Sequence, residues 1–425
     1  MNSKTRPVHV LGGNRIPFAR ANGPYAKASN QDMLTAALDG LVTQTGIAGE
    51  RIGEVAAGAV LKHARDFNLT RETVLGIKLD PHTPAYDVGQ ACGTGLETFI
   101  LTANKVALGQ VDSAIAGGVD TVSDAPIALN DDLREILLEA QGARSNADRV
   151  KALLKIRPQH IVPDIPRNSE PRTGMSMGEH TAVMAAEWGI TREAQDELAA
   201  RSHQDLAAAY EEGFFDDLVT PYLGLERDHN LRPDTSVEKL AKLKPAFGGE
   251  GGTMTAANST PLSDGASAVL LGSEEWAAEH KLESLARFVD AETAAIDHVN
   301  AGEGLLIAPT YAVPRMLARN ELSLQDFDLY EIHEAFAAQV LVTLKAWEDP
   351  VYCKEKLGLS EPLGEIDRTK LNPKGGSLAV GHPFAATGGR IVASCAKQLK
   401  AMGGGRALIS ICAAGGQGVV AILDR

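Results

Sequence analysis

The chain has 425 residues, 44% of them hydrophobic and 23% charged, and this length predicts two or three domains of a globular protein. Its formal net charge of −14 argues against a protein that binds nucleic acid or an anionic membrane by general electrostatic attraction. Aromatic residues make up only 5% whereas glycines number 42, which favours closely packed helices and tight turns over an aromatic recognition surface.

The N-terminal stretch and the cysteines indicate the compartment. MNSKTRPVHVLGGNRIPFAR contains no long apolar core and no small-residue cleavage site, so it does not resemble a secretory signal. The sequence has no run of about 18 apolar residues that could span a membrane. Its four cysteines lie far apart without a CxxC pair, which argues against structural zinc or a disulfide framework and fits a reducing compartment. We therefore expect a soluble, cytoplasmic protein without a metal site.

The first part of the chain alternates short β-branched runs with alanine-rich helical stretches, the pattern of an α/β protein. Its predicted elements are strands at 7–11, 54–60, 85–88 and 113–117 and helices at 30–45 and 95–108. From about residue 124 the composition changes, and charged helical stretches such as ADRVKALLKI are joined by proline-rich turns. We interpret 124–247 as a mainly helical region inserted into the α/β core, which resumes at GGTMTAANSTPLSDGASAVLL.

A second α/β series follows the insert. Its predicted elements are strands at 327–331, 407–411 and 418–423 and helices at 335–347 and 386–402. The two series share a design, because each places a reactive side chain at a glycine-rich strand-to-helix junction, Cys92 in QACGTG and His382 in GHPFAATGG. This similarity predicts an internal duplication of a βαβ-type unit.

Cys92 and His382 are the first candidate pair for chemistry. Cys92 precedes a predicted helix, where free backbone N–H groups and the positive end of the helix dipole favour the thiolate. On local grounds alone, a small buried cysteine explains the position equally well. His382 can accept a proton from a thiol or donate a hydrogen bond to a developing oxyanion, and its alternative is a turn histidine bonded to backbone.

Two further junctions add a second thiol and a second imidazole. Cys412 ends an apolar strand in ISICAAGGQG, where it can exchange a proton with a substrate carbon or simply pack in the core. His333 and Glu334 lie in EIHEAFAAQ at a predicted helix start, where a carboxylate often serves only as a dipole complement. The stretch lacks the second histidine of an H-E-x-x-H zinc motif. Together these residue types supply a nucleophile, a base, an acid and oxyanion donors.

The motifs QACGTG, HEAFAAQ, GHPFAATG and CAAGGQG occur in the order and spacing of the thiolases, and the sequence closely resembles that family over essentially its whole length. RIPFAR near the N-terminus, AGGVD at 116–120 and TAANSTPLSDGASA at 255–268 extend the resemblance. Many thiolases have Asn in place of His333. The His form, and the insert around 126–175, are similar to the branch that contains the β-subunits of fatty-acid β-oxidation complexes.

The resemblance implies a duplicated thiolase fold of the α/β class, with five layers in the order α-β-α-β-α and an inserted, mainly helical loop domain. The implied segments are an N-terminal half with the nucleophile at 1–124, the loop domain at 125–247, a return to the N-terminal half at 248–285 and a C-terminal half at 286–425. It also implies a homodimer or homotetramer and, in this branch, a hydratase/dehydrogenase partner subunit. The charged insert is either a solvated surface or a docking site for such a subunit or a membrane.

Catalytic roles follow from the resemblance as well. The cysteine matching Cys92 takes the acyl group in thiolases, and the histidine matching His382 activates it. The cysteine matching Cys412 protonates or deprotonates the α-carbon of the acetyl unit.

Two oxyanion holes complete the implied site. The residue at the position of His333, together with the main histidine, holds the oxygen of the enolate-like intermediate, and Glu334 organises this site. The second hole uses backbone N–H groups, here those of Cys92 and Ala414. Ala414 stands where related sequences often have Gly, which restricts φ but keeps the donor.

The resemblance implies CoA or acetyl-CoA as a co-substrate and no permanently bound cofactor. By position, the residues that line the pantetheine channel are Met177, Ala256, Ser259 and Thr260. Each of them is explained as well by ordinary packing of a small-residue turn.

The leading hypothesis for function is a 3-ketoacyl-CoA thiolase, an acetyl-CoA acyltransferase of fatty-acid breakdown. An acetoacetyl-CoA thiolase that condenses two acetyl-CoA molecules uses the same residues. A decarboxylating ketosynthase on the same fold pairs one cysteine with two histidines, and Cys412 argues against it. A non-catalytic acyl-CoA carrier does not require the complete set of reactive residues.

Overall fold

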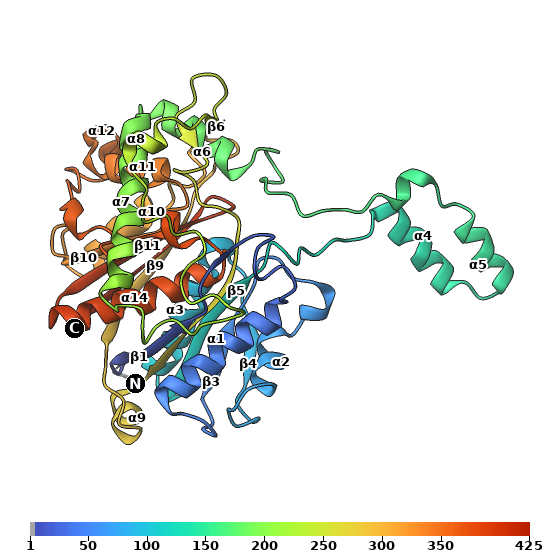
Figure 1. The fold of residues 1–425 in the computed structure, drawn as a ribbon, viewed down its shortest axis with the longest axis horizontal. Helices are drawn as coiled ribbons and strands as arrows, with labels where there is room; N and C mark the ends of the chain where they lie inside the picture. Colours follow the sequence, from blue (N-terminus) through green and yellow to red (C-terminus); the bar gives the residue numbers. More distant parts are fainter. Residues whose placement is uncertain (1–4) are drawn as a thin grey trace.

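The computed structural model describes residues 5–425 and shows two similar halves joined through one ten-stranded sheet (Figure 1). The sheet order is β10-β11-β12-β9-β1-β8-β5-β3-β4, and the short strand β2 pairs with β8. The strands of the first half are β1 (Val8–Arg15), β2 (Ala19–Arg20), β3 (Glu54–Ala57), β4 (Ala85–Asp87), β5 (Ser113–Asp120) and β8 (Ser263–Gly272). Those of the second half are β9 (Ala286–Ala295), β10 (Leu329–Ile332), β11 (Arg406–Ala413) and β12 (Gln417–Asp424).

The strand directions repeat between the halves, as the predicted duplication requires. In the first half β3 runs parallel to β5, and β8 and β1 follow in antiparallel steps. In the second half β10 runs parallel to β11, and β12 and β9 follow in antiparallel steps. The antiparallel pairing of β1 with β9 joins the two halves. A long helix precedes the equivalent strand in each, α3 (Thr94–Ala107) before β5 and α14 (Ala386–Met402) before β11.

Three hydrophobic clusters define five layers. The middle cluster joins α3 and α14 to the inner faces of both groups of strands, including Leu271 of β8 and Ile409 of β11. The neighbouring strand residues Leu270 and Leu408 point the opposite way, into the two outer clusters. Alternate strand residues thus fill layers on opposite sides of each sheet portion. The α-β-α-β-α order expected from the resemblance is confirmed.

Helices close both outer faces of this core. The first half carries α1 (Asn30–Thr45), α2 (Leu69–Leu75) and α9 (Glu274–Glu279). The second half carries α10 (Pro309–Arg319), α11 (Ala337–Glu348), α12 (Pro350–Glu355) and α13 (Ser377–Val380). Ser29 and Asp32 form a capping box that begins α1, and Gly46 in the left-handed conformation ends it, so its predicted bounds are reproduced.

Most predicted elements are present, with shifts of a few residues at their ends. The strand β9 was not predicted, because most of its ARFVDAETAA sequence is only partly buried and carries charges. His333 and Glu334 lie in the turn after β10 and not at the start of a helix, since α11 begins at Ala337. No helix within residues 5–425 is both long and apolar enough to cross a membrane.

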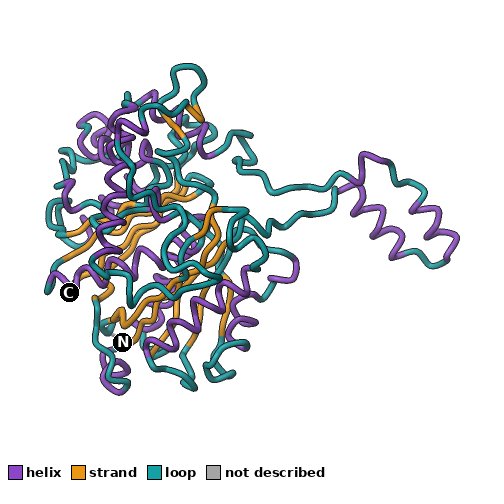
Figure 2. Tube along the Cα trace, viewed as in Figure 1, coloured by secondary structure: helices purple, strands orange, loops and turns teal. Residues whose placement is uncertain are grey.

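The inserted region divides into a covering part and a projecting arm (Figures 1 and 2). The covering part consists of α6 (Met177–Glu187), α7 (Arg192–Glu211), α8 (Val237–Leu240) and the two-stranded β6 (Pro245–Phe247) and β7 (Met254–Thr255). The arm is a helical hairpin of α4 (Asp131–Gly142) and α5 (Asn146–Leu153), carried on two extended segments away from the body. Its helices touch through Ile136, Ala140 and Ala152, the buried residues of this hairpin.

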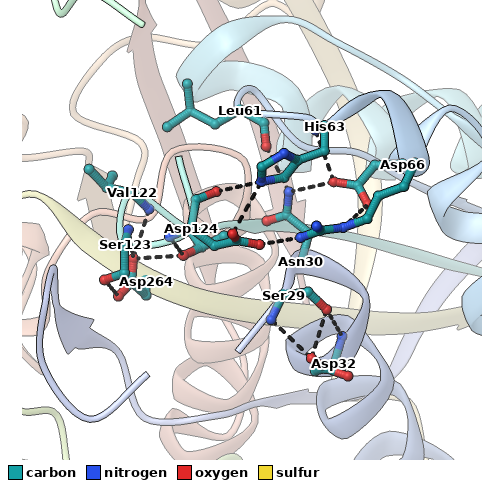
Figure 3. Close-up of polar contacts among 12 residues, drawn as sticks. Ser29, Asn30, Asp32, Leu61, His63, Asp66, Val122, Ser123, Asp124 and Asp264 are labelled. Carbon is teal, nitrogen blue, oxygen red and sulfur yellow. Dashed lines mark hydrogen bonds and ion pairs between the residues drawn. The ribbon is translucent and has the colours of Figure 1, made fainter. Parts of the chain in front are cut away.

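The first root of the arm is held by polar contacts with the loop that follows β3 (Figure 3). His63 Nε2 lies 3.0 Å from the carbonyl oxygen of Asp124, and Arg65 pairs with the Asp124 carboxylate. Next to it, Asp264 of β8 accepts the backbone N–H groups of Val122 (2.7 Å) and Ser123 (3.1 Å). These contacts anchor the start of the insert to the core, beside the site described next.

Candidate active site

The site forms where the N-terminal ends of α3 and α14 cross. The approach is so close that a Cβ on Gly95 would lie 2.4 Å from the carbonyl oxygen of Ala385, and one on Gly388 would lie 2.1 Å from the amide nitrogen of Leu96. Only glycine fits at such distances. These two glycines therefore bring the junction that carries Cys92 and the junction that carries His382 together.

Cys92 and His382, 290 residues apart in the sequence, form a thiol–imidazole pair. His382 Nε2 lies 3.2 Å from Cys92 Sγ, and His382 Nδ1 lies 2.6 Å from Thr387 Oγ1. If Nδ1–H donates to the threonine oxygen, Nε2 is the ring atom that accepts the thiol proton. Ala91, directly before the cysteine, has φ of +47°, an uncommon value for a residue with a side chain and one that turns the chain sharply at the nucleophile.

Burial favours the neutral form of both partners. Burial raises the pKa of the Cys92 thiol to about 12, and two backbone N–H groups offset this only in part. Burial, with the positive charge of Arg390, lowers the pKa of His382 to about 3. Burial thus opposes the thiolate form that the helix dipole favours. The histidine acts as a base only while the thiol attacks.

A neutral pair predicts how Cys92 reacts with iodoacetamide. Because the thiolate fraction below the pKa rises tenfold per pH unit, we expect the alkylation rate to rise about tenfold per unit between about pH 6 and 9 without levelling off. Mass spectrometry of the Cys92 peptide measures this rate. The urea-unfolded chain is the control, and its rate levels off near the ordinary thiol pKa of 9.0. A plateau from about pH 5 upward in the folded protein would contradict the prediction and indicate a thiolate–imidazolium pair.

Two backbone donors and a second thiol surround Cys92 Sγ. The backbone N–H groups of Ala414 and of Cys92 itself interact with the sulfur and favour its thiolate form. Cys412, at the end of β11, lines the same cavity, and it is 2% exposed. Burial, followed by the nearby Cys92, raises the pKa of the Cys412 thiol well above its usual value, so this group also holds its proton.

His333 packs against His382, with ring centroids 4.2 Å apart. Its Nδ1 lies 2.8 Å from Ser377 Oγ, which also accepts a hydrogen bond from Arg390 Nη2 at 2.9 Å. Since the serine hydroxyl has no other acceptor among residues 5–425, its hydrogen points to Nδ1 and the proton of His333 resides on Nε2. This buried Nε2 has no partner within the described chain and is available as a donor. Burial lowers the pKa of His333 well below its usual value.

Glu334 is buried, at 1% exposure. Its carboxylate accepts hydrogen bonds from Ser202 Oγ (2.7 Å), Asn372 Nδ2 (2.7 Å) and the backbone N–H of Leu378 (3.2 Å). It thereby holds α13 and the helix α7 of the insert in place. Since α13 begins with Ser377, the residue bonded to His333, the carboxylate supports that ring indirectly.

Asp120, at the end of β5, also joins the two halves beside Cys92. Its carboxylate accepts the N–H groups of Val60 (2.9 Å), Leu61 (2.8 Å) and Ala385 (2.8 Å). Burial raises the pKa of this carboxyl to about 7. Asp120, Thr387, Ser377 and Arg390 were not singled out from the sequence. The only signal for Asp120 was its place in AGGVD, and the others have no local pattern that distinguishes them.

Two cavities meet at Cys92. The first has a volume of about 270 Å³ and is lined by Cys92, His382, Cys412 and Ala414 together with Met177, Phe247, Ser259 and Thr260. Three of the four residues expected to contact pantetheine therefore lie at this cavity. Ala256 does not, because it is exposed and is absent from the lining of both cavities. Ser259 Oγ is buried without a hydrogen-bond partner in the described chain, so it is free to bind a ligand.

The second cavity has a volume of about 420 Å³ and shares Cys92, Met177 and Phe384 with the first. Its apolar lining consists of Val60, Leu61, Val122, Pro166, Leu262 and Phe384. Residues 166–171, where the arm returns to the body, form one wall. Leu61 is fixed from both sides, since Asp120 accepts its N–H and Asn30 Nδ2 donates to its carbonyl oxygen at 2.7 Å (Figure 3).

Comparison with known proteins identifies the class to which this fold and site belong. The family model described as Thiolase, N-terminal domain, matches residues 8–275, and the model described as Thiolase, C-terminal domain, matches residues 282–425. The chain therefore belongs to the thiolase family, and the resemblance seen in its motifs is confirmed.

Individual relatives agree with this assignment. The chain is similar to the 3-ketoacyl-CoA thiolase of Yersinia pestis (strain Pestoides F), with 39% identity over 423 residues that cover 98% of this chain and 96% of the relative. Among solved structures, the Bacillus anthracis acetyl-CoA acetyltransferase matches with a TM-score of 0.82 and 29% identity over 100% of both chains. Human mitochondrial 3-ketoacyl-CoA thiolase matches with a TM-score of 0.81 and 27% identity over 98% of both chains. The same human enzyme in complex with CoA has a TM-score of 0.79.

Proposed function

We propose that this protein is a 3-ketoacyl-CoA thiolase, an acyltransferase that uses CoA to cleave 3-ketoacyl-CoA into acetyl-CoA and a shortened acyl-CoA. The observation that carries the proposal is the 3.2 Å contact between Cys92 Sγ and His382 Nε2 in a cavity that Cys412 also lines. A thiol beside a base can form a thioester with the substrate. A second, protonated thiol nearby can donate its proton to the α-carbon of the leaving group. A carrier without catalysis needs neither.

The first half of the reaction breaks the carbon–carbon bond. Cys92 Sγ attacks the 3-keto carbon while its proton passes to His382 Nε2, and the oxyanion is held by the N–H groups of Cys92 and Ala414. The C2–C3 electron pair then moves into the thioester of the leaving acetyl-CoA. Its enolate-like oxygen accepts hydrogen bonds from protonated His382 and from His333 Nε2–H. Cys412 donates its proton to the α-carbon and releases acetyl-CoA.

The second half regenerates the enzyme. The thiol of an incoming CoA attacks the acyl group on Cys92, and the same two backbone N–H groups hold the new oxyanion. The Cys92 sulfur leaves and is reprotonated through His382, while the proton of the CoA thiol replaces the one that Cys412 gave to carbon. Because each half uses the acyl-cysteine, we expect ping-pong kinetics.

The two cavities suit the two parts of the substrate. The first, with Met177, Ser259 and Thr260, receives the pantetheine arm of CoA, so the reacting carbons lie between Cys92 and Cys412. The second, larger and apolar, receives an acyl chain longer than acetyl. This second volume favours cleavage of longer 3-ketoacyl-CoA over the alternative of an acetoacetyl-CoA thiolase that works in the condensation direction.

Measuring thiolysis rates as a function of acyl-chain length tests the proposed preference for longer substrates. We expect the wild-type enzyme to cleave 3-ketoacyl-CoA substrates of about eight or more carbons at least as efficiently as acetoacetyl-CoA. Leu61→Trp narrows the second cavity, and we expect it to lower kcat/KM about tenfold or more for the longer substrates and less than about threefold for acetoacetyl-CoA. Leu75→Trp is the matched control, since Leu75 is exposed on α2 and lines neither cavity. Wild-type activity confined to acetoacetyl-CoA would instead support the condensing enzyme.

The remaining expectations stay proposals. All four cysteines are unpaired, which supports a reducing, cytoplasmic compartment. The homo-oligomer and the hydratase/dehydrogenase partner subunit rest on the resemblance. We also keep the division into 1–124, 125–247, 248–285 and 286–425, since 286 begins β9, the strand that opens the second half.

A further inference from the structure

A buried carboxylate from the inserted region reaches the turn that follows Cys412. Glu170, in the segment where the arm returns to the body, is 7% exposed, and its Oε1 accepts the backbone N–H of Gly415 at 2.6 Å. Its own backbone is held in a turn, because Glu170 N–H donates to the carbonyl of Met175 and Gly174 N–H donates to the carbonyl of Glu170. The carboxylate is therefore fixed relative to α6, which begins two residues after Met175.

The turn that Glu170 contacts is tightly constrained. Gly415 and Gly416 have φ of 80° and 69°, left-handed values that glycine adopts without strain. The Gly416 carbonyl accepts the N–H of Ile296, and a Cβ on Gly416 would lie 2.8 Å from Nδ1 of His298. His298 Nε2 in turn lies 3.8 Å from Glu170 Oε2. The residue just before these glycines is Ala414, which lines the same cavity as Cys92 and whose N–H interacts with its sulfur.

We propose that Glu170 is a positioning residue for acyl transfer, which holds the Ala414–Gly415 turn so that the Ala414 N–H stays directed at the oxyanion formed on Cys92. The inference rests on the proposed thiolase function. The carboxylate bonds to Gly415, one residue beyond the donor, and so acts through the turn. The inserted region therefore completes the site that both halves of the core build.

The carboxylate has a second, measurable effect on Cys92. Burial is the main cause of the raised pKa of the Cys92 thiol, and the charges of Asp120 and Glu170 add to it. Neutralising Glu170 without changing its shape makes the thiolate easier to form. The alkylation rate therefore reports the charge of Glu170 near Cys92, whereas kcat reports its hold on the turn.

Three variants separate the possible roles. Glu170→Ala removes the acceptor, and we expect kcat for thiolysis to fall about 30-fold or more with KM within about threefold, since the loss concerns an oxyanion donor. Glu170→Asp keeps the charge but withdraws the acceptor by one methylene, and we expect a similar loss of kcat. Glu170→Gln keeps an oxygen acceptor for Gly415, so we expect kcat within about threefold of wild type and Cys92 alkylation at pH 8 roughly threefold faster. Glu187→Gln, an exposed residue at the end of α6, is the control.

The outcomes are decisive in both directions. Wild-type kcat in both Glu170→Ala and Glu170→Asp, or a loss in Glu170→Gln as large as in Glu170→Ala, overturns the inference. So does an unchanged alkylation rate in Glu170→Gln. Glu170→Asp and Glu170→Gln keep a folded protein in the test if the alanine variant is unstable. Wild-type protein without thiolysis in the same assay refutes the proposed function itself, which distinguishes the two failures.

Discussion

Cys92→Ala is expected to abolish thiolysis, with kcat for a 3-ketoacyl-CoA lowered by about 10⁴-fold or more. The substitution removes the sulfur that lies 3.2 Å from His382 Nε2, so no acyl-enzyme can form. The alanine variant loses a single atom from a half-buried site, and we expect it to fold with an unchanged circular dichroism spectrum. The measurement is release of acetyl-CoA and of the shortened acyl-CoA.

Mass spectrometry tests directly whether Cys92 carries the acyl group. Wild-type protein incubated with acyl-CoA should gain the mass of one acyl group on the peptide that contains Cys92, and the alanine variant should not. Cys353→Ala is the matched control. Cys353, in α12, is also a free cysteine, but it is buried and its thiol contacts the backbone carbonyls of Ala346 and Trp347. Unchanged turnover in Cys92→Ala would remove the whole mechanism.

Cys412→Ala should lower kcat for thiolysis by about 10³-fold or more, because it removes the acid that protonates the α-carbon. Acyl transfer from a saturated acyl-CoA to Cys92 involves no proton transfer to or from carbon. We therefore expect the acyl-Cys92 adduct to form at a rate within about tenfold of wild type. The two rates are expected to respond differently because Cys92 forms the carbon–sulfur bond and Cys412 transfers a proton to carbon, although both thiols line one cavity. Single-turnover kinetics of each half-reaction measures the two rates separately.

The same variant tests the decarboxylating alternative. A ketosynthase mechanism generates its carbanion by loss of CO₂ and relies on two histidines, so it does not need the second thiol. Turnover of malonyl thioesters by wild type, with full activity retained in Cys412→Ala, would support that mechanism against ours. Equal losses in both half-reactions would show that Cys412 acts on the shape of the site and not as an acid.

Local sequence predicted the elements well because their signals are local. Helix α1 was predicted with its observed ends, since its capping box and C-terminal glycine lie within or beside it. The strand β9 was missed because its burial pattern depends on pairing with β1 and β12, which lie far away in the sequence. The start of α11 was placed too early because Glu334 resembles a first-turn carboxylate, whereas it bonds to Ser202 and Asn372.

The candidate site divides in the same way between residues with a local sequence signal and residues that depend on long-range contacts. Motifs at four junctions were sufficient to name Cys92, His382, Cys412 and His333, because reactive residue types beside glycine-rich turns are recognisable in the chain itself. The residues that contact or position these four could not be named from the sequence. Their relevance comes only from contacts between distant segments of the two halves and the insert, as for Thr387, Ser377, Asp120 and Glu170.

The sequence by itself thus determined the α/β architecture, its duplication, the thiolase family and the candidate thiols and imidazoles of the site. Only the tertiary structure showed that burial raises the pKa of Cys92 and lowers that of His382, because the segments that bury the two groups come together only in the fold. It also decided that a second, mostly apolar cavity shares Cys92 with the first and that Glu170 of the insert bonds to the turn at Gly415. Protonation state and cavity shape are properties of packed neighbours, and these neighbours come together only when the chain folds.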